Sequence, residues 1–418
     1  MRPGAYQLRP GHQVQLLQGG NAYFAALVQA IDQSAHEVRM ETYIFNLAGS
    51  GLAVAESLER AARRGVAVYL MMDGVGTPAL PAPWVTRFDA AGVQWRIFSP
   101  LGRLGLLIPS RWRRLHRKLC VVDGQLAFCG GINILDDYFD PNHGQLAAPR
   151  FDFAVQVSGP LVRRAHEACA QFWWRLQAAR TARSADFTAA WHALQEAVAE
   201  RRRAQLEGAT TDSGAADFTD APEPAGALTR AELVLRDNLL NRSRIERAYR
   251  RAIGEARHDI IIANAYFVPG GKLRKSLIHA ATRGVRVRLL LQGRYEYFMQ
   301  YHACRPVYGA LLAAGVEIHE YSASFLHAKV AVIDSHWATV GSSNLDPLSL
   351  LLAREANVVV DDRSFALALQ ARLEQAMAEG GQRIDPLVYA HRPWQQRVLD
   401  RLAYGLMRAM LFLSGKRY

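Results

Sequence analysis

His116-Arg-Lys-Leu-Cys-Val-Val-Asp123 and His327-Ala-Lys-Val-Ala-Val-Ile-Asp334 place histidine, lysine and aspartate at identical spacing in two parts of one chain of 418 residues. Each stretch is followed by a short glycine-containing run that ends in asparagine, Gly130-Gly-Ile-Asn133 in the first copy and Gly341-Ser-Ser-Asn344 in the second. A polar set repeated in this way predicts one active site that is built from two halves of the chain.

The repeat extends well beyond these two motifs and keeps the same order in both halves. The matching segments are 37–45 with 259–267, 61–74 with 280–293, and 90–93 with 313–316. Each half alternates amphipathic helical segments with apolar strand-like runs, a pattern typical of βαβ units. We therefore predict an α/β fold of two similar domains, each a mixed, mostly parallel sheet flanked by helices.

Composition changes along the chain predict the domain boundaries. We expect an N-terminal domain at 1–183, a charged helix and flexible linker at 184–229, a C-terminal domain at 230–390 and a basic amphipathic helix at 391–418. The stretch 208–227 is small, polar and proline-containing, and is interpreted as a flexible linker, with a regulatory segment as the alternative. From Trp394, apolar residues recur at helical spacing among arginines. A helix lying in a membrane interface and one packed on the core both fit this tail.

Charge and composition narrow the class of partner. Lys and Arg number 50 against 38 Asp and Glu, a formal charge of +12, which favours nucleic acid or an anionic membrane. The sequence has no apolar stretch of the ~20 residues that a spanning helix needs and no apolar region near its start typical of a signal peptide. On lipid, the protein is expected to act peripherally. Its four cysteines form neither a disulfide framework nor a zinc spacing.

The paired motifs suit the chemistry of phosphodiesters. One histidine attacks phosphorus and forms a phosphohistidine, while the other protonates the leaving oxygen and then activates an incoming hydroxyl. The groups expected to hold the phosphoryl oxygens come from both copies, namely Lys118, Lys329, Asn133, Asn344, Gly131 and Ser342. No metal and no other cofactor is needed for these steps.

A nucleophilic histidine must be oriented through its second nitrogen, usually by a carboxylate. Each half has one candidate downstream of its motif, Asp152 before one strand-like run and Glu355 before another. Each run is expected to lie beside the histidine strand, and a surface acid at the start of a strand is the alternative. Asp123 and Asp334 belong to the expected catalytic set, although they also suit hydrogen-bonded turns that anchor loops.

The residues that carry the chemistry resemble those of a known family. The motifs resemble the HKD motifs of the phospholipase D superfamily, and the similarity is strongest to bacterial cardiolipin synthases of the short form without N-terminal membrane spans. It covers roughly residues 13–180 and 230–375 and rests on Glu41-Thr-Tyr-Ile-Phe45, Arg114-Leu-His-Arg-Lys118, Tyr308 to Tyr321, Phe325-Leu-His-Ala-Lys329 and Val340-Gly-Ser-Ser-Asn-Leu-Asp-Pro-Leu-Ser349.

This resemblance implies two halves related by a pseudo-twofold axis and a catalytic set of His116, Lys118, Asp123, His327, Lys329 and Asp334. It implies phosphatidyl transfer from phosphatidylglycerol, with phosphatidylethanolamine as another donor, to a hydroxyl of phosphatidylglycerol. His116 is then the nucleophile and His327 the acid and base. The implied partner is an anionic membrane containing phosphatidylglycerol and cardiolipin, with peripheral binding at the bacterial cell membrane and no nucleic acid.

Three other functions use the same residues: hydrolysis of phospholipids by a phospholipase D, cleavage of nucleic acid by a superfamily nuclease, and a non-catalytic membrane scaffold. The absence of a recognised nucleic-acid module disfavours the nuclease, and the intact histidines and lysines disfavour the scaffold. The segment 101–115, which runs into His116, mixes apolar residues with arginines. It suits insertion into an anionic interface, and a core strand at 104–108 is the alternative.

Overall fold

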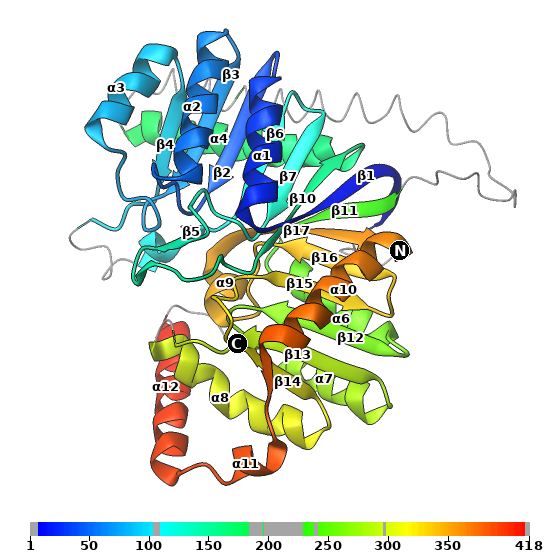
Figure 1. Ribbon diagram of the computed structural model, residues 1–418. Coiled ribbons are helices and arrows are strands. Elements are labelled where there is room, and N and C mark those ends of the chain that lie inside the picture. Colours follow the sequence, from blue (N-terminus) through cyan, green and yellow to red (C-terminus); the bar gives the residue numbers. More distant parts are fainter. Residues whose placement is uncertain are drawn as a thin grey trace, which may run out of the picture.

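The computed structural model describes residues 7–102, 109–183, 195, 229–237, 241–295 and 298–413. These residues form two α/β lobes stacked on each other, one from each half of the chain (Figure 1). The predicted linker lies almost entirely outside the described residues, and so does the core strand considered at 104–108.

The N-terminal lobe follows the predicted alternation of helix and strand. Its longer strands are β1 (Arg9–Gln18), β2 (Glu37–Thr42), β3 (Ala67–Asp73), β4 (Gln94–Phe98), β6 (Leu119–Val122), β7 (Leu126–Gly130) and β10 (Phe153–Ser158). Three two-residue strands are β5 (Arg114–Leu115), β8 (Phe139–Asp140) and β9 (Gly144–Gln145). The helices are α1 (Gly19–Asp32), α2 (Ser50–Arg63), α3 (Ala82–Ala91), α4 (Leu161–Arg183) and the 3₁₀ helix η2 (Pro109–Trp112).

The C-terminal lobe repeats this order of elements. Its strands are β11 (Thr229–Arg236), β12 (Asp259–Asn264), β13 (Arg286–Gln292), β14 (Glu317–Tyr321), β15 (Lys329–Ile333), β16 (Trp337–Gly341), β17 (Ala353–Asp361) and β18 (Gly381–Arg383). Its helices are α6 (Arg244–Glu255), α7 (Gly271–Thr282), α8 (Phe298–Ala313), α9 (Pro347–Leu352), α10 (Arg363–Gly380), α11 (Pro386–Ala390) and α12 (Trp394–Leu413).

A single sheet runs through both lobes. Its strand order from β4 at one end is β4-β3-β2-β6-β7-β10-β1, and it continues as β11-β17-β16-β15-β12-β13-β14-β18. Read outward from the centre, both halves use equivalent strands in the same order. The two central strands, β1 and β11, are themselves equivalent and pair antiparallel. Antiparallel pairing of equivalent strands is what a twofold axis between the lobes requires, so the topology supports the pseudo-twofold arrangement.

The expected mixed sheet flanked by helices is present, but its parallel part is smaller than expected. Parallel pairing joins β2, β3 and β4 in one lobe and β12, β13 and β14 in the other. The described strands between these two sets pair antiparallel. The reason is that each motif strand is followed by a tight hairpin, β6 to β7 and β15 to β16, and a hairpin joins antiparallel strands.

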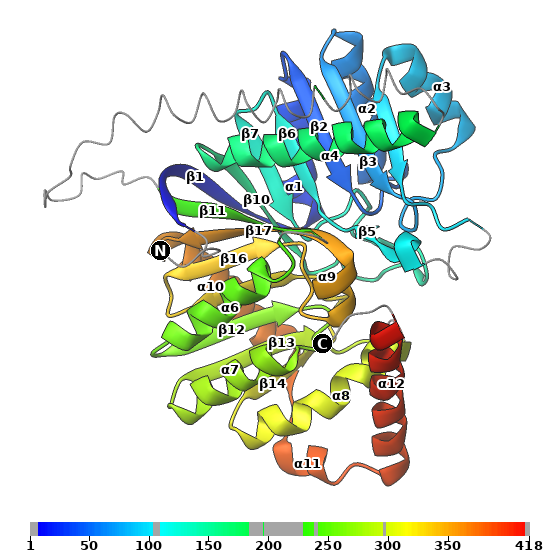
Figure 2. The same ribbon diagram turned by 180° about the vertical axis from the view of Figure 1, so that it is seen from behind.

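Helices cover both faces of the sheet. Figure 1 shows α1, α2 and α3 in front of the N-terminal strands with α4 behind them, and Figure 2 shows α6, α7 and α8 covering the opposite face of the C-terminal lobe. Strands covered on both faces are apolar along their length, as in Ile260, Ile261 and Ile262 of β12, which are fully buried. Cys120 and Cys129 are free thiols buried in the core.

Asp123 and Asp334 lie at the far ends of the motif strands and anchor turns. Asp123 accepts hydrogen bonds from the backbone N–H groups of residues 35, 36 and 37, each at 2.8 Å. Asp334 accepts from residues 257, 258 and 259 at 2.8–2.9 Å. Both have a positive φ of 50°. The extended chain between each histidine and its aspartate spans roughly 20 Å. The structure thus places both aspartates in hydrogen-bonded turns, which was the alternative considered for them, and does not bring them beside the histidines.

The tail forms the predicted helix, α12, which packs along α8. One side of α12 is buried on the core, as the core-packing interpretation expected, while large apolar side chains on another side remain exposed. Among the described helices, none combines the length and apolar character needed to cross a bilayer.

We predict that Asp123→Ala lowers the free energy of unfolding by about 2 kcal/mol, because a charged acceptor of three N–H groups is lost. Asp334→Ala should behave alike. Backbone hydrogen bonds outweigh burial and hold the pKa of both carboxyls below the usual range. Their contribution is thus present above the unfolded pKa and disappears as the pH falls through the folded pKa. Urea titrations at several pH values measure this, with exposed Glu255→Ala as control. A loss of turnover without destabilisation would contradict it.

Candidate active site

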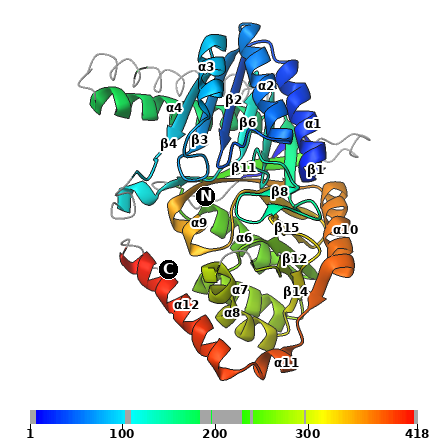
Figure 3. The same cartoon turned by 60° about the vertical axis from the view of Figure 1, so that its left-hand side comes forward.

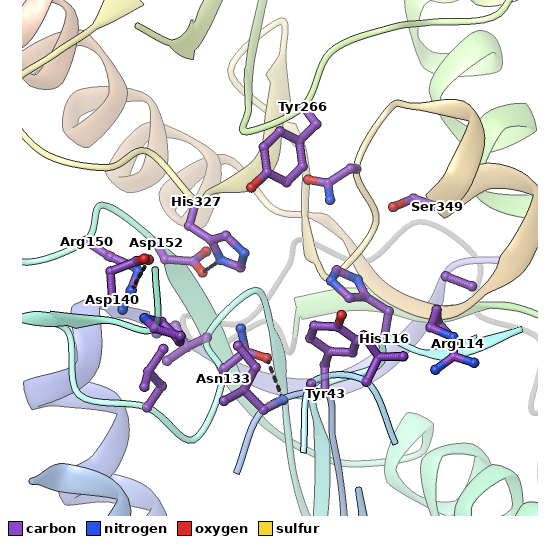
Figure 4. Close-up of a pocket in the computed structure, with 18 of the residues that line it drawn as sticks. Tyr43, Arg114, His116, Asn133, Asp140, Arg150, Asp152, Tyr266, His327 and Ser349 are labelled. Carbon is purple, nitrogen blue, oxygen red and sulfur yellow. Dashed lines mark hydrogen bonds and ion pairs between the residues drawn. The ribbon is translucent and has the colours of Figure 1, made fainter. Parts of the chain in front are cut away.

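A cavity of about 900 Å³ lies between the two lobes and receives side chains from both. His116 of the N-terminal lobe and His327 of the C-terminal lobe both line it. Figure 4 shows their rings approaching the same space from opposite sides. The structure therefore brings the two histidines of the repeat into one site.

Each histidine is held by backbone pairing with the opposite lobe. β5 pairs parallel with the start of β17, and the N–H of His116 donates to the carbonyl of Arg354 at 3.0 Å. In the other direction, Phe151 bridges to Leu326, and its carbonyl accepts from the N–H of His327 at 2.9 Å. Both histidines precede their motif strands, which begin only at residues 119 and 329. The positions of both rings thus depend on contact between the lobes.

The carboxylates expected to orient the histidines do so across the lobes. Glu355 Oε1 lies 2.9 Å from Nδ1 of His116, and Asp152 Oδ2 lies 2.6 Å from Nδ1 of His327. Glu355 is fully buried and Asp152 nearly so. Each histidine is therefore paired with the acid that follows the other motif, an exchange between the halves that the sequence analysis did not specify. The reason is that strands of the two lobes pack on each other beside the central β1–β11 seam, where β7 contacts β17 and β10 contacts β16.

The pair of His116 and Glu355 favours an ionised acid and a neutral imidazole. Burial would raise the pKa of Glu355, but His116 and a hydroxyl hydrogen bond from Ser342 at 2.5 Å hold it below its usual value. Burial lowers the pKa of His116, and Glu355 opposes this only in part. Because a carboxylate only accepts, Nδ1 of His116 carries the proton. Nε2 is then left with its lone pair, which is the form of a nucleophile.

The pair of His327 and Asp152 differs in protonation. Burial raises the pKa of Asp152 to about 7. Burial and the neighbouring Lys329 lower the pKa of His327 well below its usual value. Near neutral pH, Asp152 therefore keeps its proton and donates it in a hydrogen bond to Nδ1 of His327. The neutral imidazole of His327 then carries its own proton on Nε2. The residues next to the two acids differ between the halves, because Ser342 contacts Glu355 whereas the equivalent Gly131 lies against Asp152. A Cβ atom added at Gly131 would lie only 2.2 Å from Asp152 Oδ1, so this position has no room for a side chain.

The two lysines lie behind the histidines rather than in the cavity wall. Lys118 and Lys329 are buried, and each Nζ donates to the carbonyl of the histidine two residues before it. Burial lowers the pKa of Lys118 to about 7. From these positions the lysines act on the histidines through charge and backbone position, whereas direct contact with phosphoryl oxygens was expected.

The four other predicted phosphate-binding residues separate into two groups. Asn133 and Asn344 line the cavity. Asn133 accepts from the N–H of Ile44 through its side-chain oxygen, which leaves its amide N–H₂ as a donor toward the site. Gly131 and Ser342 are absent from the wall of the cavity and instead contact the orienting carboxylates. Gly131 and Ser342 therefore affect the surroundings of the two carboxylates, whereas Asn133 and Asn344 face the cavity.

Four further residues of the wall were not predicted. Tyr43 and Tyr266 come from the matching segments 37–45 and 259–267 but stand one position apart in the repeat, because Tyr266 aligns with Ile44. The ring of Tyr43 packs edge-on against His116 with centroids 5.1 Å apart. Arg114 is paired with Asp73 at 3.1 Å, and Arg150 with Asp140 at 2.7 Å. Aligning the segments 37–45 and 259–267 does not reveal the tyrosines, because it pairs Tyr43 with Ala265 and Ile44 with Tyr266. The repeat does not mark the arginines either, because Arg114 and Arg150 both lie in the N-terminal half.

We predict opposite pH dependences for neutral replacements of the two acids. The folded pKa of Asp152 is raised, so its ionisation destabilises the fold increasingly from about pH 4 to pH 7, and Asp152→Asn should gain stability relative to the native chain over that range. The folded pKa of Glu355 is lowered, so Glu355→Gln should lose stability near neutrality and recover in acid. Thermal melts between pH 4 and pH 8 measure both. Parallel curves for the two variants would contradict the asymmetry.

Comparison with known proteins identifies the family to which this arrangement belongs. The family described as "Cardiolipin synthase, PLD-like domain" matches residues 27–148 and 249–377, one segment in each lobe. Cardiolipin synthase B of Escherichia coli is 35% identical over 416 residues, which cover 97% of this chain and 90% of that protein. Cardiolipin synthase A of Cronobacter sakazakii is 28% identical, covering 94% of this chain and 75% of that protein.

A solved structure shares the fold at low sequence identity. The crystal structure of phosphatidylserine synthase from Haemophilus influenzae has a TM-score of 0.63 at 11% identity and covers 97% of this chain and 96% of its own. At that identity the likeness concerns the fold alone, and it extends over both lobes. The matched segments and the near full-length relatives show that this chain belongs to the cardiolipin synthase family of phospholipase D-like proteins.

Proposed function

We propose that this protein is a phosphatidyltransferase that makes cardiolipin from two molecules of phosphatidylglycerol and releases glycerol. The observation that carries the proposal is the shared cavity, in which two imidazoles from different lobes are each oriented by a carboxylate of the other lobe. The names of the relatives, cardiolipin synthases B and A, support the same reaction. Phosphatidylethanolamine, which would release ethanolamine, is the second donor considered.

In the first step, Nε2 of His116 attacks phosphorus and the bond to the headgroup oxygen breaks. His327 gives its Nε2 proton to the leaving oxygen, while Asp152 returns a proton to Nδ1, so that the acid ends ionised and the imidazole neutral. The product of this step is a phosphatidyl group on His116. Asn133, Asn344 and the arginines of the wall stabilise the charge that develops on the phosphoryl oxygens.

In the second step, His327 removes the proton from a hydroxyl of the acceptor lipid, and that oxygen attacks phosphorus. The bond to Nε2 of His116 breaks, and the proton taken by His327 restores the starting pair with Asp152. The two steps are mirror images, so one site serves both without a further group. His116 as nucleophile fits the ionised Glu355 behind it, and His327 as acid and base fits the proton-retaining Asp152.

The walls of the cavity favour a lipid over a nucleic acid. Much of the wall is apolar and is formed by Ile44, Val75, Leu101, Trp112, Ile132, Leu135 and Leu352. Such a surface accommodates the glycerol backbone and the start of acyl chains, whereas a nuclease groove tracks a phosphate backbone with cations and stacked aromatics. The partner proposed is an anionic bilayer that contains phosphatidylglycerol and cardiolipin, bound peripherally at the bacterial cell membrane.

We expect purified protein given phosphatidylglycerol in vesicles to form cardiolipin and glycerol in equal amounts. Mass spectrometry of the lipids and an enzymatic assay of glycerol measure the two products. Phosphatidic acid without cardiolipin would identify a hydrolase and contradict transfer. Cleavage of single-stranded DNA without any lipid product would replace the proposal with a nuclease. Adding phosphatidylethanolamine tests the second donor, because free ethanolamine then appears.

We predict that the two histidines can be separated by the leaving group of the substrate. His116→Ala should abolish turnover of every phosphatidyl ester, because no nucleophile remains. His327→Ala should lose transfer from phosphatidylglycerol by roughly 10²–10⁴-fold, yet still release p-nitrophenolate in a single burst from a p-nitrophenyl ester, because that group leaves without a proton. Mass spectrometry should find the phosphatidyl adduct on residue 116.

Surface His336, whose side chain is 57% exposed, provides the matched control as His336→Ala, which should behave as the native chain. A burst from His116→Ala and none from His327→Ala would exchange the two roles. Circular dichroism of each variant checks that the fold is retained.

We predict that turnover of phosphatidylglycerol falls as the pH rises above about 7. Burial raises the pKa of Asp152 to about 7 and lowers that of Lys118 to about 7, so the proton of the acid pair and a buried positive charge are lost over the same range. The p-nitrophenyl ester should show a weaker decline, because its first step needs no acid. Profiles of kcat/KM from pH 5 to pH 9 measure this. A rate that keeps rising to pH 9 would contradict the assignment.

A further inference from the structure

Helix α12 exposes a row of large apolar side chains along its length. Trp394, Leu402 and Leu406 are 69%, 65% and 56% exposed, and Val398 and Leu399 lie between them with 43% and 39% exposed. At roughly 100° per residue, these five residues fall within an arc of about 140° around the helix. We call this arc the apolar face of α12. Single exposed apolar residues are ordinary on a protein, whereas a contiguous row needs an explanation.

The opposite side of α12 is fixed to the body of the protein. Asp400, 3% exposed, accepts from Nδ1 of His302 on α8 at 2.8 Å and from Arg392 at 3.0 Å. Ala403 is buried, and Tyr404 and Met407 pack on the C-terminal core. The helix is therefore held rigidly with its apolar face outward, so this face is not a core contact that was left incomplete.

Charge on the exposed part of α12 is of one sign. Arg397, Arg401 and Arg408 are exposed and lie on one flank of the apolar face, within an arc of about 40°. In the described part of the helix, the only acidic residue is Asp400, which is buried and paired. An apolar face bordered by arginines matches a surface that has apolar depth and negative charge.

The position of α12 agrees with the proposed site. Figure 1 and Figure 3 show α12 on the same side of the molecule as α9, whose Ser349 and Leu352 line the cavity. The 3₁₀ helix η2 contributes Trp112 to the same wall. A flat surface laid against this side would meet α12 while facing the part of the protein that contributes Trp112, Ser349 and Leu352 to the cavity wall.

We propose that the apolar face of α12 is the membrane-docking surface, and that it inserts into the interface of a bilayer containing anionic phospholipid while the flanking arginines contact lipid phosphates. This inference rests on the proposed action on phospholipid and adds the surface through which the protein reaches it. Docking through α12 keeps the cavity beside the bilayer, so a lipid needs only to be lifted partly from it.

A second copy of the chain fits this face less well. Two α12 helices packed on each other would bring exposed arginines close together, with no exposed acid on the described helix to match them. A bilayer supplies the missing negative charge and takes up leucine and tryptophan side chains without a shaped partner. Charge complementarity therefore selects the lipid surface as the occupant.

The test is flotation of the full-length protein with vesicles of phosphatidylglycerol and phosphatidylcholine, compared with vesicles of phosphatidylcholine alone. We expect Leu402→Glu and Leu406→Glu each to weaken binding by about tenfold or more, because a charge replaces a side chain that enters the acyl boundary. The matched control is Leu367→Glu on α10, which is 43% exposed and should bind as the native chain. Arg397→Gln with Arg401→Gln should reduce both the preference for phosphatidylglycerol and the salt sensitivity.

Transfer between monomeric short-chain phosphatidylglycerol molecules separates docking from catalysis. Leu402→Glu should retain this activity while losing turnover on vesicles. If neither protein transfers phosphatidyl groups but flotation still differs, the docking surface stands and the proposed function fails. Equal flotation of Leu402→Glu and native protein overturns the docking proposal. A native dimer that Leu402→Glu converts to a monomer, measured by light scattering, also overturns it and assigns the face to a second copy.

Discussion

The reciprocal exchange of carboxylates between the lobes is the constraint on which the site depends. Glu355 holds His116 and Asp152 holds His327, so neither lobe contains a complete histidine–acid pair of its own. The exchange is possible because β1 and β11 join the two halves into one sheet, beside which β7 contacts β17 and β10 contacts β16. Burial of both acids at this seam strengthens each contact and sets the protonation of the imidazoles. The packing that stabilises the lobes thus also prepares the chemistry.

Approximate symmetry and local asymmetry have separate roles. The twofold arrangement delivers two equivalent imidazoles to one cavity, which suits a reaction whose second step reverses the geometry of the first. Small differences then separate their tasks. Glu355 accepts from the hydroxyl of Ser342, whereas Asp152 faces Gly131 and keeps its proton to about pH 7. A duplicated scaffold therefore yields a nucleophile and an acid without any large change in structure.

The repeat in the sequence was enough to predict two α/β halves, the meeting of His116 and His327, and the involvement of Asp152 and Glu355. It was not enough to predict which acid serves which histidine, because that pairing follows from how the lobes pack. Spacing likewise suggested a catalytic place for Asp123 and Asp334, although an extended strand carries them away from the cavity to a turn. The contacts of Lys118 and Lys329 with the histidine carbonyls were not predicted. The alternation of residues shows on which face of a strand a side chain begins, but not where the end of a long side chain lies.

The exchange of partners has a consequence for how the two halves diverge. A substitution beside Glu355, such as a change of Ser342, alters the electronic state of a histidine encoded more than two hundred positions away, while leaving the nearer His327 with its own acid. A substitution in one copy of the duplication therefore changes the protonation of a histidine in the other copy. In relatives, a substitution near the acid of one copy should be accompanied by a compensating substitution near the histidine of the other copy. The two halves are therefore expected to evolve together.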